Sequence, residues 1–173
     1  VGHNAANKLV FVDQFAGSLM KGNNGQGPVP CIANLVGDSK QEIVAGSTLY
    51  ALPTPPPGVT KIADCAVGAM DNFCLGKLDV VWDGQTVNGI AKIPTANRDG
   101  FCAVADILGA NPALAPSPQN PLDGKPEVAL IANGYLVILD GATGTLLRFV
   151  DLGTGTNGGA PNVGDFDGDG FPE

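Results

Sequence analysis

Short apolar runs alternate with turn-forming residues along most of the chain. The clearest runs span residues 127–132, 136–139 and 146–152, with Gly, Asn and Thr residues between them. Runs of this length that are rich in Val, Ile and Leu and bounded by such residues are typical of β-strands joined by tight turns. The 25 Gly and 14 Pro residues show no three-residue period, which excludes a collagen-like fold. The pattern therefore predicts an all-β fold.

Two motifs recur along the chain, and the first is a strand, a Gly-containing turn and a second strand. Residues 9–19 match residues 136–146 without a gap. The second motif is a short strand that leads into an acidic loop, and it occurs three times, beginning at Asn34, Asp106 and Asp165. A repeated strand pattern of this kind is typical of arrays in which each unit packs on its neighbours.

The acidic loops share a spacing. In the first and last copies an acid, Glu42 or Glu173, stands eight residues after the opening Asn or Asp. In the middle copy Glu127 stands 21 residues after Asp106, so this copy contains 13 extra residues. The extra residues are rich in Pro, Asn and Ala, which predicts a surface loop at 110–122.

Together the motifs predict units of four antiparallel strands, the pattern of a β-propeller blade. We expect the end of one blade at 1–26, a second blade at 27–99 with an inserted loop at 53–77, a third at 100–152, and the start of a fourth at 153–173. Within the second unit, strand character resumes at 78–82 and 87–93. Roughly two and a half blades leave faces uncovered, so we expect the remainder of the same propeller to be a partner. A β-sandwich is the alternative fold.

Charge and hydropathy narrow the range of partners. Seventeen acids stand against nine Lys and Arg residues, for a net charge of −8. No basic cluster is present that would neutralise phosphates, which argues against nucleic acid as a partner. The longest apolar stretch, 128–139, is interrupted and is shorter than the ~20 residues that span a bilayer. We therefore expect no membrane span.

The last acidic loop has the chemistry of a calcium site. Asp165, Asp167, Asp169 and Glu173 stand at positions one, three, five and nine, and Phe171 at position seven offers a backbone carbonyl. Calcium takes six to eight oxygen ligands in flexible geometry, whereas magnesium requires a stricter octahedron. An EF-hand would place Glu at position twelve between helices, and this loop follows a strand-like segment. A plain acidic turn without metal is the other alternative.

Residues 159–173 resemble the FG-GAP/VCBS repeat of integrin α-like β-propellers. The weaker copies extend the resemblance over most of the chain except 53–99. It implies that each acidic loop joins the first two strands of a blade and holds calcium. The second candidate set comprises Asp106, Asp123, Lys125 and Glu127, with Leu108 at position three. The weakest set comprises Asn34, Asp38 and Glu42, with Val36 at position three.

The four cysteines favour disulfides. Cys31, Cys65, Cys74 and Cys102 form no CxxC pair and have no neighbouring histidine, which argues against zinc. Four cysteines allow three pairings, and the spacing favours a local Cys65–Cys74 bond and a Cys31–Cys102 bond between successive units. Disulfides indicate an oxidising compartment, so we expect a secreted, periplasmic or cell-surface protein. Free buried thiols are the alternative.

These features predict a non-catalytic scaffold that binds a protein or glycan, as adhesion proteins do, through the 53–77 and 110–122 loops. His3 is the only histidine, and the sequence shows no pair suited to acid–base or nucleophilic chemistry. Trp82 lies in an apolar run and is predicted to be a core residue rather than a sugar platform. The alternatives are a calcium-dependent, lyase-like enzyme acting on polysaccharide, and an architectural subunit of an extracellular assembly.

Overall fold

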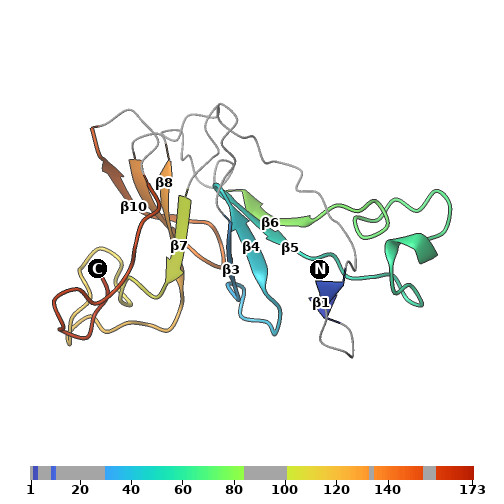
Figure 1. The fold of residues 1–173 in the computed structure, drawn as a ribbon. Coiled ribbons are helices and arrows are strands. Elements are labelled where there is room, and N and C mark those ends of the chain that lie inside the picture. Colours follow the sequence, from blue (N-terminus) through green and yellow to red (C-terminus); the bar gives the residue numbers. More distant parts are fainter. Residues whose placement is uncertain (1, 4–8, 11–29, 84–100, 133–134, 154–158) are drawn as a thin grey trace.

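The computed structural model describes residues 2–3, 9–10, 30–83, 101–132, 135–153 and 159–173. Within them the chain forms two four-stranded antiparallel sheets and a short strand pair, β1 (Gly2–His3) with β2 (Leu9–Val10) (Figure 1). Across the described ranges, helix is limited to one 3-10 turn, η1 (Ile62–Asp64). The all-β prediction is confirmed. Most of the expected blade end at 1–26 and the expected strand at 87–93 lie outside the described residues.

Both sheets are simple meanders. The first sheet has the order β3 (Cys31–Ala33), β4 (Glu42–Ala45), β5 (Thr48–Ala51), β6 (Asp79–Asp83). The second has the order β7 (Phe101–Ala105), β8 (Glu127–Ala132), β9 (Tyr135–Asp140), β10 (Leu146–Asp151). Each strand pairs with the next one along the chain, which is the order that a propeller blade requires. The arrangement of blades in a propeller stays a prediction.

The two sheets differ most in the connection between their third and fourth strands. In the second sheet a tight turn at 141–145 joins β9 to β10, whereas in the first sheet residues 52–78 join β5 to β6. This longer segment contains η1 and a disulfide between Cys65 and Cys74. In Figure 1 it extends from β5 and β6 away from the second sheet.

One apolar core joins the two sheets. Side chains of both sheets pack in it, together with Leu35, which lies two residues after β3. The core residues are Leu35, Val44, Leu49, Trp82, Cys102, Val128, Leu130, Val137 and Leu139. A disulfide between Cys31 and Cys102 links β3 to β7 across this core. Both cysteine pairs therefore form as the spacing favoured.

Trp82 fixes the turn at 141–144 against the first sheet. Its side chain is only 5% exposed, and its Nε1 donates a hydrogen bond of 3.0 Å to the carbonyl of Gly141. Gly144 lies under the indole with φ +69°, and a Cβ there would lie 2.6 Å from the ring. Trp82 is thus a core residue, as predicted, and the turn requires glycine because no side chain fits beneath the ring.

The second sheet is also covered on its other face. Because successive strand residues point to opposite faces, Ala129 faces away from the core that Val128 and Leu130 enter. Ala129 packs there with Ile107 and Leu108, and Val163 of the C-terminal segment contacts this cluster. The 159–173 segment therefore lies against the face of the second sheet opposite the first sheet. No helix among the described residues is long and apolar enough to cross a membrane.

Candidate metal centre

The three acidic loops start and end in the same way. In each, the residue before position one pairs through its backbone with the Glu at position nine. The strand pairs are Ala33 with Glu42 and Ala105 with Glu127. In the last loop, Gly164 and Glu173 exchange backbone hydrogen bonds of 2.9 and 3.3 Å. The three loops therefore close at the same point of an antiparallel pair, despite the extra residues of the 106–127 loop.

The Glu at position nine is bonded to its own loop. Its Oε2 accepts a hydrogen bond from the backbone N–H of position two in every copy: Leu35 at 2.7 Å, Ile107 at 2.7 Å and Phe166 at 2.9 Å. In the first two loops the N–H of position three donates to the same oxygen. Through these bonds the Glu at position nine holds the start and the end of its loop together. Sequence reasoning assigned it only as a ligand, although the spacing of this acid was the signal that aligned the loops.

The side chain at position one also has one role in all copies, because it accepts the backbone N–H of at least one glycine of its loop. Asn34 Oδ1 accepts from Gly37 at 3.0 Å. Asp106 Oδ2 accepts from Gly124 at 2.7 Å. In the last loop Asp165 accepts from Gly168, Asp169 and Gly170 at 2.7 to 3.0 Å. Position one thus organises the turn through these hydrogen bonds.

Position five completes the shared pattern by accepting the N–H of position seven. Asp38 accepts from Lys40 at 2.7 Å, Asp123 from Lys125 at 3.0 Å, and Asp169 from Phe171 at 2.8 Å. The extra residues of the middle loop enter between positions four and five, and leave these bonds in place. The three loops are therefore structural repeats of one another.

The 165–173 loop brings three carboxylates together. Asp165, Asp167 and Asp169 each offer an oxygen, and these oxygens lie within 4.8 Å of one another. All three side chains are exposed, and the loop contains no Lys or Arg. Like charges this close repel unless a cation lies between them, and hard oxygen donors suit calcium. Glu173 is not part of this group of three, and its Oε2 accepts the N–H of Phe166.

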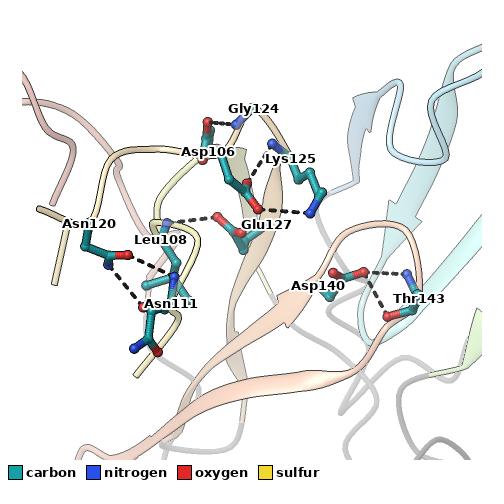
Figure 2. A network of polar contacts seen from close by, with 10 residues as sticks. Asp106, Leu108, Asn111, Asn120, Gly124, Lys125, Glu127, Asp140 and Thr143 are labelled. Carbon is teal, nitrogen blue, oxygen red and sulfur yellow. Dashed lines mark hydrogen bonds and ion pairs between the residues drawn. The ribbon is translucent and has the colours of Figure 1, made fainter. Parts of the chain in front are cut away.

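The 106–127 loop contains the second acidic group (Figure 2). Oxygens of Asp106, Asp123 and Glu127 lie within 4.8 Å of one another, and Glu127 is only 6% exposed. Asp106 Oδ1 is buried and has no hydrogen-bond partner among the described residues. The ammonium group of Lys125 is close to this group, with Nζ 3.1 Å from Asp123 Oδ2. This group therefore fits a metal ion less simply than the last loop does.

Two acids of the 106–127 loop have pKa values shifted in opposite directions. Burial raises the pKa of Glu127; hydrogen bonds from Leu108 and Ile107 oppose this, and the charges of the neighbouring acids add to it. Burial also acts to raise the pKa of Asp123, but its contacts with Lys125 prevail and the pKa is lowered. The same pair raises the pKa of Lys125. The loop thus combines a carboxylate that resists ionisation with an ion pair.

The insertion at 110–122 is folded around a single amide. Asn120 is only 4% exposed, and its Nδ2 donates to the carbonyls of Asn111 and Ala115, each at 3.1 Å. Its Oδ1 accepts the N–H of Asn111 at 2.9 Å (Figure 2). Composition predicted a surface loop here, and the buried amide explains why this loop is ordered without disturbing the acidic group.

The 34–42 loop closes mainly through hydrogen bonds. It contains only two acids, Asp38 and Glu42, and Glu42 is 1% exposed. The Asn34 side chain donates to the carbonyl of Asp38. Beside this loop, at the junction of the two sheets, lies a hollow of about 340 Å³ lined by residues 34–37, 124–126, 140 and 142. Because it contains only two acids, the 34–42 loop has less carboxylate charge to offer a cation than the other two loops.

Comparison of the chain with protein-family models, curated proteins and solved structures found no match. The resemblance to FG-GAP/VCBS repeats therefore stays a prediction.

Proposed function

We propose that this chain is part of a secreted or cell-surface β-propeller, stabilised by calcium, that acts as a non-catalytic binding scaffold. The observation that carries the proposal is the hydrogen-bond pattern shared by the three loops, which ends in a loop with three convergent carboxylates. The two disulfides support an oxidising compartment. Both meander sheets have the strand order of a blade.

Calcium would stabilise the loop by neutralising charge. Asp165, Asp167 and Asp169, with the carbonyl of Phe171, would hold the ion, which relieves the repulsion between the three carboxylates. The loop follows the residues that pack on the second sheet through Val163. A bound ion would therefore fix the position of this segment as well as the loop itself.

Two constrained segments would present the binding surface. Within residues 52–78 the Cys65–Cys74 disulfide closes a smaller loop, which exposes the apolar side chains of Val67 and Met70. The 110–122 insertion is held by Asn120 and exposes Leu114. Constrained loops lose little conformational entropy on binding, which favours recognition of a protein or glycan at these segments.

Calcium titration by calorimetry on the full chain tests the metal part of the proposal. We expect Asp167→Asn to remove one bound ion, because it removes one of the three convergent carboxylates. The backbone pattern of the loop should remain, since among the described residues Asp167 accepts only the N–H of Asp169. Asp151→Asn is the matched control, since Asp151 accepts the N–H of Gly153 in the same way outside the acidic groups. Equal stoichiometry in both variants would reject a calcium site in the last loop.

The non-catalytic part has its own test. Incubation of the protein with polygalacturonate and calcium, followed by absorbance of unsaturated sugars, should give no product. Formation of such products would replace the scaffold with the lyase-like alternative and leave the calcium result unaffected.

A further inference from the structure

We propose that Lys125 competes with calcium for the 106–127 loop and so makes it the weaker of the two acidic sites. The proposal rests on the proposed function, because it assumes that these loops bind calcium. Lys125 stands at position seven of this loop and belongs to the second candidate set.

The ammonium group of Lys125 lies against a carboxylate of the acidic group. Lys125 Nζ lies 3.1 Å from Asp123 Oδ2, and Lys125, Asp123, Glu127 and Asp140 line one hollow of about 170 Å³. The ammonium therefore lies beside carboxylates that a divalent cation would need. The side chain of Lys125 is 75% exposed, so it is able to move into solvent when another cation binds.

The ammonium leaves one carboxylate of the acidic group incompletely satisfied. Asp106 Oδ1 is buried without a hydrogen-bond partner among the described residues, although Asp106 Oδ2 accepts from Gly124. A buried carboxylate oxygen without a donor or cation is unfavourable. The loop thus keeps one oxygen suited to a metal ion, while its lysine neutralises another carboxylate.

The residue at position seven differs among the three loops. Position seven is Phe171 in the 165–173 loop, which has three carboxylates and no basic residue. Position seven is Lys40 in the 34–42 loop, which has only two acids. The 106–127 loop alone combines three acids with a lysine at this position, so Lys40 provides a control for the general effect of removing a positive charge.

The effect of the ammonium on calcium affinity follows from Coulomb repulsion. A monovalent and a divalent cation a few ångströms apart at the protein surface repel enough to lower the binding constant on the order of tenfold. We therefore expect Lys125→Met to tighten calcium binding at this loop about tenfold. Lys125→Arg keeps the charge and should leave the affinity within about twofold of that of the parent.

The experiment is calcium titration by calorimetry in an Asp167→Asn background, which silences the last loop. Lys125→Met is compared with Lys125→Arg and Lys40→Met, after circular dichroism in EDTA has shown that each is folded. Tighter binding in Lys125→Met alone supports the proposal. Equal affinity in all variants, weaker binding in Lys125→Met or no binding in any of them overturns it.

Failure of the proposed function would look different. In that case the parent chain and Asp167→Asn would bind the same number of calcium ions. A gain of affinity in Lys125→Met would still be measurable in that case, so the two results are separable.

Discussion

The disulfide between Cys31 and Cys102 offers a quantitative test of the two-sheet arrangement. It closes a loop of 71 residues in sequence separation, whereas Cys65 and Cys74 are separated by 9. In the chain-entropy model these separations correspond to about 4.4 and about 2.7 kcal/mol of stabilisation through the unfolded state. The first bond also lies in the core that joins the sheets, and Cys102 is buried there.

Replacement of each pair by alanine should therefore have unequal effects. We expect the Cys31/Cys102 double variant to lose about 4 kcal/mol of unfolding free energy. The Cys65/Cys74 variant should lose less than about 2.7 kcal/mol, because its bond lies in a peripheral segment that is able to loosen without global unfolding. Urea unfolding followed by tryptophan fluorescence measures both, since Trp82 lies in the core. Equal losses, or a larger loss in the Cys65/Cys74 variant, would refute the assignment of the first bond to the joint between the sheets.

Three further predictions concern local contacts. Glu42→Ala should lower the unfolding free energy measured in urea by about 3 kcal/mol, because it removes a carboxylate acceptor from backbone N–H groups. A loss equal to that of the exposed Gln41→Ala would contradict the role of Glu42 in closing its loop. Gly144→Ala should cost about 3 kcal/mol through its positive φ and the contact with Trp82; an unchanged melting temperature would contradict that contact. The raised pKa of Glu127 means that the folded chain takes up a proton before the unfolded chain does as pH falls. In EDTA the parent should therefore gain stability relative to Glu127→Gln on acidification through that pKa, and a relative loss would contradict the burial of this carboxylate.

The strands and the acidic loops were predictable from the sequence because both depend on local patterns. Apolar runs bounded by turn residues identified β8 to β10, and strand character at 78–82 corresponds to β6 (Asp79–Asp83). The spacing of eight residues between Asn34 and Glu42, and between Asp165 and Glu173, aligned loops that share their hydrogen bonds. The cysteine pairing followed from that alignment, because it placed Cys31 and Cys102 at neighbouring points of successive units.

The remaining features depend on contacts that a linear pattern does not contain. Trp82 was expected in the core, but its bond to Gly141, 59 residues away, requires the packing of the two sheets. Glu127 was predicted only as a metal ligand, because its position in the sequence does not show that its carboxylate accepts the N–H groups of Ile107 and Leu108. The order of the 110–122 insertion depends on the burial of Asn120, and its composition alone suggested only a loop.

The most direct test of calcium stabilisation is the melting temperature of the full chain in EDTA and in calcium at about a hundredfold excess over its Kd. Binding at that excess adds about 2.7 kcal/mol to the stability of the folded state. For a chain of this size that corresponds to a rise of roughly 5–10 °C. We expect this rise in the parent chain and in Asp151→Asn, and a smaller rise in Asp167→Asn, because the last loop then no longer holds the ion. Equal melting temperatures of the parent in EDTA and calcium would contradict it.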